Sequence, residues 1–75
     1  MGRLRPLPFR EVKRRLESVG FVETSQKGSH VKFVRRIKEA VDTAIVPRKP
    51  EIPVGTLHSI LSQAHMALED WEKLA

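Results

Sequence analysis

His30 and Lys32 are the residues of this chain whose types and spacing could do chemistry. They lie in residues 26–33, where a glycine is followed by alternating polar and apolar side chains. Because successive strand side chains point to opposite faces, His30 and Lys32 are expected on the wet face and Val31 and Phe33 on the core face. A histidine beside a cation in a basic chain indicates a site that could hold and cut a phosphate ester. A half-buried strand with an incidental surface histidine would produce the same pattern, so this stretch alone does not decide.

RNA cleavage without a metal needs three functions, and these residue types can supply them. A base must take the proton of the 2′-hydroxyl, an acid must protonate the leaving 5′-oxygen, and positive charge must face the pentacoordinate phosphorus. Histidine side chains suit proton transfer because their usual pKa of about 6.5 lies near neutral pH. Lysine and arginine stabilise developing negative charge. Lys27 lies just across the predicted turn from His30 and adds a second cation.

The size and composition describe one small domain, with no indication of a metal or cofactor site. The 75 residues include no cysteine, which excludes disulfides and thiolate metal sites. His58 and His65 are seven residues apart on a predicted helix, about 10.5 Å along its axis and too far to share one metal ion. We therefore expect no metal, no cofactor, and ordinary surface positions for these two histidines. No apolar run approaches the roughly 20 residues of a membrane span and no signal-peptide core is visible, so the default expectation is cytoplasmic.

Positive charge is concentrated in the first two thirds of the chain. Residues 1–49 contain 13 Lys/Arg and 5 Asp/Glu, a net charge of +8, whereas residues 50–75 contain 1 and 4, a net charge of −3. This asymmetry favours nucleic-acid binding by the front of the chain, although a basic face can also be simply solvated. A short basic arm is expected over residues 1–7. The same two readings apply to a cluster on the first predicted helix: Arg10, Lys13, Arg14 and Arg15.

Hydrophobic periodicity predicts a helix, three strands and two further helices. The first helix is expected over residues 8–19, with Gly20 at its C-terminal cap. Its apolar positions recur every three or four residues: Phe9, Val12, Leu16 and Val19. Strands rich in β-branched and aromatic residues are expected over residues 21–25, 29–35 and 43–46. A second helix over residues 54–65 and a short last helix have apolar stripes of their own: Leu57, Ile60, Leu61 and Ala64, then Leu68, Trp71 and Leu74.

This order predicts a single α+β domain over residues 1–75. An antiparallel three-stranded sheet with the helices packed on one face is the economical arrangement, because the other face can stay in contact with water. The connection at residues 36–41 contains no glycine and is expected to be longer than a tight hairpin turn. Trp71 is expected to cover the core or, alternatively, to lie on a partner surface.

Six short motifs occur in a specific order and spacing: Gly20-Phe21, Lys27-Gly28-Ser29-His30, Val46-Pro47, Gly55-Thr56-Leu57, Ile60-Leu61 and Gln63-Ala64. With these motifs the chain resembles the HicA family, also described as YcfA-like. Members of this family are small RNA-cleaving toxins of toxin–antitoxin pairs. The resemblance runs over residues 9–71, nearly the whole chain.

The resemblance implies a fold like that of a double-stranded-RNA-binding domain. It also implies a metal-independent endoribonuclease that cleaves mRNA (an mRNA interferase) and is restrained by a HicB-like antitoxin covering the histidine face. The family's motif histidine falls on His30, which is therefore expected to be catalytic. Gly28 and Ser29 match the same motif and are expected to let the RNA backbone approach closely. The cations expected to bind RNA are Lys27, Lys32, Arg35, Arg48 and Lys49.

The chain departs from the family pattern at three places. Many relatives have a second histidine shortly after the Val-Pro motif, where this chain has Arg48 and Lys49. A lysine at its usual pKa of about 10.4 is a poor proton shuttle, so the activity is expected either to be lower or to rest on His30 alone. Relatives also often have a compact Asp-Gly turn near residues 36–41, and glycine where this chain has His65, which predicts a less sharp break between the last two helices. Two alternatives stay open: an RNA-binding module of the same fold that does not cleave, and a degenerate relative kept as a protein-interaction partner.

Overall fold

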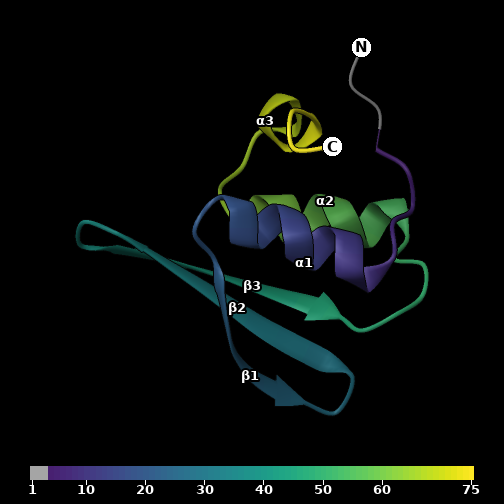
Figure 1. The fold of residues 1–75 in the computed structure, drawn as a ribbon, viewed down its shortest axis with the longest axis horizontal. Helices are drawn as coiled ribbons and strands as arrows, with labels where there is room; N and C mark the ends of the chain where they lie inside the picture. Colours follow the sequence, from purple (N-terminus) through teal and green to yellow (C-terminus); the bar gives the residue numbers. More distant parts are fainter. Residues whose placement is uncertain (1–3) are drawn as a thin grey trace.

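A computed structural model describes residues 4–75 and confirms the predicted order of elements. The helices and strands are α1 (Phe9–Ser18), β1 (Val22–Lys27), β2 (His30–Ile37), β3 (Ala40–Pro47), α2 (Val54–Gln63) and α3 (Leu68–Glu72). The three strands form one antiparallel sheet in the order β1-β2-β3. Figure 1 shows α1 and α2 side by side over one face of this sheet, with α3 on the far side of the two helices. No helix within residues 4–75 is long and apolar enough to cross a membrane.

The core lies between the sheet and the two long helices. Val31 and Phe33 of β2 are fully buried, whereas their neighbours His30 and Lys32 are exposed. This is the alternation that the sequence predicts for a sheet with one wet face. The helices contribute buried apolar stripes to the same cluster: Phe9, Val12 and Leu16 from α1, and Leu57, Ile60 and Leu61 from α2. Trp71 of α3 is 1% exposed and belongs to this cluster, so it covers the core as predicted.

The chain before α1 is partly held by the core. Residues 1–3 of the predicted basic arm lie outside the described part of the chain. Leu7 forms an isolated antiparallel bridge with Ile52, in which each backbone N–H donates to the other residue's carbonyl oxygen, at 3.2 and 2.6 Å. The Leu4 and Leu7 side chains pack against the core. The segment that precedes Phe9 is therefore fixed beside the loop that leads into α2.

Both long helices end in the same backbone motif. After α1, Phe21 N–H donates to Leu16 O at 3.0 Å and Gly20 has a φ of 99°. After α2, Met66 N–H donates to Leu61 O at 3.0 Å and His65 has a φ of 55°. These are the bonds and the left-handed residue of a Schellman cap. The prediction that His65, in place of glycine, would soften the break was therefore wrong, because the histidine adopts the conformation that glycine would have.

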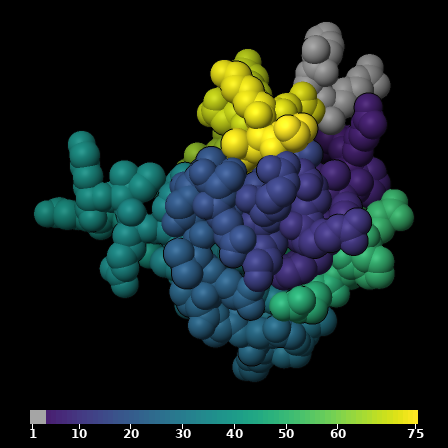
Figure 2. All heavy atoms as spheres, viewed as in Figure 1, coloured from purple at the N-terminus to yellow at the C-terminus, as the bar shows by residue number. Residues whose placement is uncertain are grey.

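The connection between β2 and β3 is a tight turn, so the prediction of a longer loop at residues 36–41 was also wrong. Ile37 pairs with Ala40, which leaves only Lys38 and Glu39 in the turn. Lys38 has a φ of 56° and supplies the positive φ that two-residue hairpins require at their first position. Both strands extend into this turn, and Figure 2 shows the resulting teal hairpin projecting well beyond the body of the molecule.

Candidate functional site

The β1–β2 turn places His30 at one end of the sheet. Gly28, with a φ of 61°, and Ser29 form the turn, and Lys27 pairs with His30 across it. The side-chain amide of Gln26 donates to Gly28 O at 3.0 Å and stabilises the turn. Arg48 N–H donates to Ser29 O at 2.6 Å, which ties the turn to the segment that follows β3. His30 is therefore held by strand neighbours on both sides.

The exposed face of the sheet carries the predicted cations around this histidine. His30 and Lys32 are both exposed and, two residues apart on β2, lie on the same face. Lys27 is the direct cross-strand partner of His30, and Pro47 is its partner on β3. Directly paired residues share a face of the sheet. Lys27, His30 and Lys32 thus form one basic surface.

A hollow of about 400 Å³ lies between this end of the sheet and α2. It brings together three of the predicted site residues, Ser29, His30 and Lys49. Three further polar residues line it from α2: Thr56, Ser59 and Gln63. The sequence analysis did not identify these three as site residues. Their spacing of three and four residues, interleaved with buried Leu57, Ile60 and Leu61, was the signal that could have revealed a polar helix face beside the histidine.

Gln63 fixes α2 against the sheet at this hollow. Its Oε1 accepts the backbone N–H of Ile45 at 3.0 Å, and its Nε2 lies 3.5 Å from Ser59 Oγ. The Ile45 N–H belongs to β3, an edge strand of the sheet. An unpaired edge N–H would otherwise be open to other chains. The amide thus protects the edge and sets the distance between α2 and the His30 end of the sheet.

Arg35 does not lie on the basic surface, which corrects its place in the predicted RNA-binding set. It has the same strand parity as buried Val31 and Phe33, and its side chain is 14% exposed. Its guanidinium lies 4.6 Å over the Phe21 ring. One terminal nitrogen donates to Asp42 Oδ2 at 2.9 Å. These contacts hold the Arg35 side chain on the helix side of the sheet. Arg35 is therefore left out of the RNA-binding proposal.

Arg48 and Lys49 are adjacent in sequence but lie in different surroundings. The Arg48 guanidinium lies 4.4 Å over the Phe9 ring and donates to Gln26 Oε1 at 3.2 Å. It therefore supports the β1–β2 turn from the α1 side while its side chain stays 46% exposed. Lys49 lines the hollow with His30. Of the two, Lys49 is the residue that occupies the place beside the histidine.

Most of the basic cluster on α1 is used in ion pairs. Arg14 and Arg15 both donate to the Glu11 carboxylate, at 2.6 to 3.0 Å. Hydrogen bonds from Arg14 and then Arg15 lower the pKa of Glu11 from 4.5 to about 2. Lys13 pairs with Glu23 of β1 at 2.9 Å, which raises the pKa of the lysine. These pairs link α1 to itself and to β1, and they favour a structural role for the cluster over a phosphate-binding one.

The other two histidines lie away from the hollow. His58 is exposed on α2, and His65 is exposed beside Asp42, with 2.7 Å between Nδ1 and Oδ1. Arg35 and then His65 lower the pKa of Asp42 through these hydrogen bonds. Within residues 4–75, no three His, Cys, Asp or Glu side chains are grouped so that they could hold a metal ion.

The arrangement around His30 can hold a phosphate and move a proton. An exposed imidazole can reach an RNA strand, and Lys49 in the same hollow can face the phosphate charge. Lys27 and Lys32 extend the positive surface along the sheet. The hydroxyl and amide groups of α2 line the opposite wall with neutral hydrogen-bonding groups.

One comparison with known proteins identifies a family. The sequence model of a family described as the HicA toxin of bacterial toxin–antitoxin pairs matches residues 9–66, which is well over half of the chain. No curated protein matches the chain. The matched residues include α1, the whole sheet, α2 and every residue that lines the histidine hollow.

Proposed function

The chain belongs to the HicA toxin family, and on that premise we propose that it is a metal-independent endoribonuclease that cleaves mRNA. The observation that carries the proposal is the hollow in which His30, Ser29 and Lys49 meet. His30 is the residue on which the family's motif histidine falls. Its exposure on a strand whose neighbours supply the packing is the position expected of a residue kept for chemistry rather than for stability.

In the proposed reaction the RNA supplies its own nucleophile. The 2′-oxygen attacks the adjacent phosphorus as the His30 imidazole takes its proton, and the bond to the 5′-oxygen breaks. The imidazolium then gives the proton to that leaving oxygen. The products are a 2′,3′-cyclic phosphate and a 5′-hydroxyl, so no external oxidant, reductant or metal enters the balance. Lys49, with Lys32 and Lys27 further along the sheet, stabilises the charge on the phosphorane oxygens.

The α2 side of the hollow is suited to a different part of the RNA. Thr56, Ser59 and Gln63 are uncharged and can donate or accept hydrogen bonds. Single-stranded RNA exposes ribose hydroxyls and base edges that such groups recognise. We assign the cationic side to the phosphate and the α2 side to the sugar or base next to it.

The same surface fits a protein inhibitor, which we propose to be a HicB-like antitoxin in the cytoplasm. Besides its cations, the wet face of the sheet exposes apolar side chains from the edge strands: Val22 at 61%, Val41 at 50% and Ile45 at 37%. Exposed apolar groups beside charged ones are typical of protein-binding surfaces. An antitoxin on this face would cover the hollow and exclude RNA.

In the complex, His30, Lys32 and Lys49 should then be protected from chemical modification. Protection confined to residues 68–74 would instead require an indirect inhibition.

Induced expression in bacteria tests the proposal. Wild type should arrest growth and degrade mRNA within the same period, and His30→Ala should do neither while accumulating to the same level. His58→Ala is the matched control, because it removes another exposed histidine outside the hollow, and it should remain toxic. Equal toxicity of wild type and His30→Ala would reject the catalytic assignment.

A binding-only relative is the second candidate, favoured by the presence of Lys49 where many family members have another histidine. In that case wild type and His30→Ala would bind RNA equally and neither would cleave it. The expression test separates the two candidates. A nuclease degrades RNA as wild type and stops doing so as His30→Ala, whereas a binding-only protein degrades RNA in neither form.

A further inference from the structure

The two faces of the sheet differ in their charge. The strands contain two carboxylates, Glu23 and Asp42. Glu23 pairs in register with buried Phe33, and Asp42 pairs with Arg35, so both carboxylates lie on the helix side of the sheet. There Lys13 donates to Glu23 and Arg35 donates to Asp42, each at 2.9 Å. The wet face therefore carries no carboxylate from any of the three strands.

The cations of the wet face have no such partners. Lys32 and Arg36 have the same parity as His30 on β2, and Lys27 is the cross-strand partner of His30. All three cations are exposed. Among the residues that the structure describes, none of these three side chains forms an ion pair or a hydrogen bond. Each can therefore neutralise a phosphate without first giving up a carboxylate.

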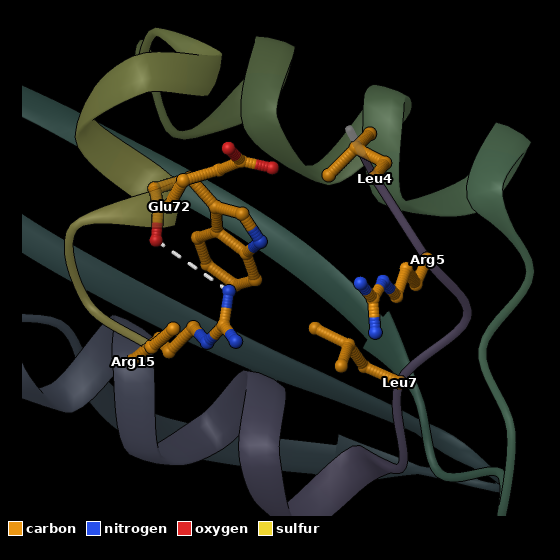
Figure 3. A pocket seen from close by; sticks show the side chains of 7 residues that line it. Leu4, Arg5, Leu7, Arg15 and Glu72 are labelled. Atoms are coloured by element: carbon orange, nitrogen blue, oxygen red, sulfur yellow. Dashed lines mark hydrogen bonds between the residues drawn. The ribbon is translucent and has the colours of Figure 1, made fainter. Parts of the chain in front are cut away.

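The cations on α1 are, by contrast, mostly engaged. Lys13, Arg14 and Arg15 all form ion pairs. Figure 3 shows Arg15 beneath α3, where its Nη1 donates to Trp71 O at 3.5 Å, while its Nε donates to Glu11 at 2.7 Å. These side chains would lose existing bonds on binding a phosphate. The cluster on α1 is thus a weaker site for RNA than the wet face of the sheet.

The free cations of β2 form a line that leads away from the hollow. Arg36 lies about 20 Å along the strand from His30, six residues at about 3.3 Å each, and Lys32 lies between them. We call these three residues the β2 track. The turn beyond it adds one charge of each sign, Lys38 and Glu39, so the track ends at Arg36. The residues of β3 paired with this face are uncharged: Val41, Thr43, Ile45 and Pro47.

The protein offers this track no aromatic ring on which bases could stack. The chain has three Phe, one Trp and no Tyr, and all of these rings are buried: Phe9, Phe21, Phe33 and Trp71. Proteins that hold single strands regardless of sequence combine a cationic groove with exposed aromatic rings. With only the cations present, the contact is with phosphates, which carry no sequence information.

On the premise of the proposed function, we propose that single-stranded RNA extends from the His30 hollow along β2 to Arg36 and is held there through its phosphates. Arg36 is thereby an RNA-binding residue remote from the bond that is cut. The predicted set contained its neighbour Arg35 instead, which lies on the other face. A phosphate contact releases counterions, so Arg36 contributes to the salt dependence of binding by the same amount for every sequence.

Oligodeoxynucleotides test the track on the intact protein, because they keep the phosphates and lack the 2′-hydroxyl that the proposed cleavage needs. Labelled oligodeoxyuridine and oligodeoxycytidine, each of about 12 nucleotides, are titrated by fluorescence anisotropy at several salt concentrations. Arg36→Gln should bind both about two- to fivefold more weakly at low salt and flatten the log–log slope by about 0.7. Arg36→Lys keeps the charge and should keep the wild-type slope.

Arg5→Gln is the matched control. It removes the same charge from another exposed arginine, which lies in the N-terminal segment and lines the same hollow as Arg15 and Trp71 (Figure 3). It should bind both oligonucleotides like wild type. An equal loss in Arg5→Gln, a loss with only one oligonucleotide, or no binding by wild type would overturn the proposal. A wild-type slope in Arg36→Gln would also overturn it and would assign Arg36 to a protein partner.

The test separates this inference from the proposed cleavage. If the expected slopes are found but the wild type cuts no RNA, the nuclease proposal fails and the β2 track stands. If the wild type cuts RNA and Arg36→Gln keeps the wild-type slope, the track fails and the nuclease proposal stands. With an active nuclease, the loss in Arg36→Gln should appear in KM rather than in kcat, because the residue does not reach the phosphorus that reacts.

Discussion

At the scale of single residues, Arg35 shows how position decides what a cation does. Its guanidinium donates to Val19 O at 3.3 Å and to Ala64 O at 3.1 Å, the C-cap residues of α1 and α2. Helix C-termini carry partial negative charge and unpaired carbonyls. One side chain therefore stabilises both helix ends, besides its ion pair with Asp42 and its contact with Phe21.

Arg35→Ala should destabilise the protein without removing RNA-binding charge from the wet face. Losing a nearly buried ion pair, two carbonyl contacts and a cation–π contact should cost about 2–3 kcal/mol in the free energy of unfolding. Lys32→Ala is the matched control on the other face of the same strand, and it should change stability by less than about 0.5 kcal/mol. Urea titration of both variants checks this. The opposite order of stabilities would mean that Arg35 is not structural.

The alternation of buried and exposed side chains along β2 was predictable from the sequence, but the structural role of Arg35 was not. Period-two parity places residue 35 with Val31 and Phe33, whereas its charge led to its inclusion in the RNA-binding set. The two carbonyls that receive its hydrogen bonds belong to helix ends 16 and 29 residues away in sequence. A pattern within one strand contains no information about such acceptors. For the same reason the α2 wall of the hollow, Thr56 to Gln63, was not identified from the sequence.

At the scale of elements, the two Schellman caps determine where α1 and α2 stop. Gly20 adopts its φ of 99° without a steric penalty, whereas His65 adopts a φ of 55° despite its side chain. The contact between His65 and Asp42 at 2.7 Å joins that helix end to β3. The turn between β2 and β3 uses Lys38 in the same way, without glycine. Glycine patterns therefore predicted the first cap and failed at the two places where another residue has a positive φ.

Gly20→Ala should destabilise the protein, and Gly55→Ala should stabilise it. A Cβ at residue 20 would meet Arg35 Cδ at an ordinary 3.5 Å, so the cost is that of a left-handed alanine, about 1 kcal/mol. Gly55 lies in α2 with open space around its Cβ direction. Alanine there should contribute up to about 1 kcal/mol through helix propensity. Thermal melts of the two variants give the comparison, and a stabilising Gly20→Ala would contradict the cap assignment.

Stability should fall in acid through the ion pairs of α1. Because the pKa of Glu11 is lowered from 4.5 to about 2 in the folded protein, its contribution is complete above pH 4.5 and is lost as the pH falls toward 2. The contribution should be about 1–2 kcal/mol once solvent screening of this partly exposed pair is allowed for. Asp42, whose pKa is also lowered, adds to the same trend. Glu11→Gln should show a shallower loss of stability between these pH values, and an unchanged slope would reject the assignment.

At the scale of the whole molecule, charge and shape separate two surfaces. The basic end of the sheet and the projecting hairpin lie on one side of the helices, whereas α3 and the N-terminal segment lie on the other (Figure 1). The net charges of +8 over residues 1–49 and −3 over residues 50–75 predicted this division only roughly. Four of the cations are neutralised in ion pairs, three of them on α1 and one between β2 and β3. The RNA surface is accordingly smaller than the charge count indicates.

RNA affinity should depend on salt through the cations of the sheet. Each phosphate contact with a single strand contributes about −0.7 to the slope of log K against log salt concentration. The double variant Lys32→Glu/Lys49→Glu should bind more weakly and with a flatter slope, by about 1.4 if both residues contact phosphates. Glu69→Lys/Asp70→Lys on α3 is the control and should leave specific cleavage unchanged. A wild-type slope in the first variant would place the RNA elsewhere on the molecule.

The proposed function depends most directly on whether the protein cleaves RNA through His30 without a metal. The decisive measurement is the digestion of a defined single-stranded RNA by purified wild type and His30→Ala in excess EDTA, with the chemistry of the new ends identified. Wild type should cut and leave a 2′,3′-cyclic phosphate, or its hydrolysed 3′-phosphate, and a 5′-hydroxyl. His30→Ala should keep the melting temperature and most of the RNA affinity while cutting at least about 100-fold more slowly. Activity that EDTA abolishes and Mg²⁺ restores, products with a 5′-phosphate, or a His30→Ala variant as fast as wild type would contradict the account.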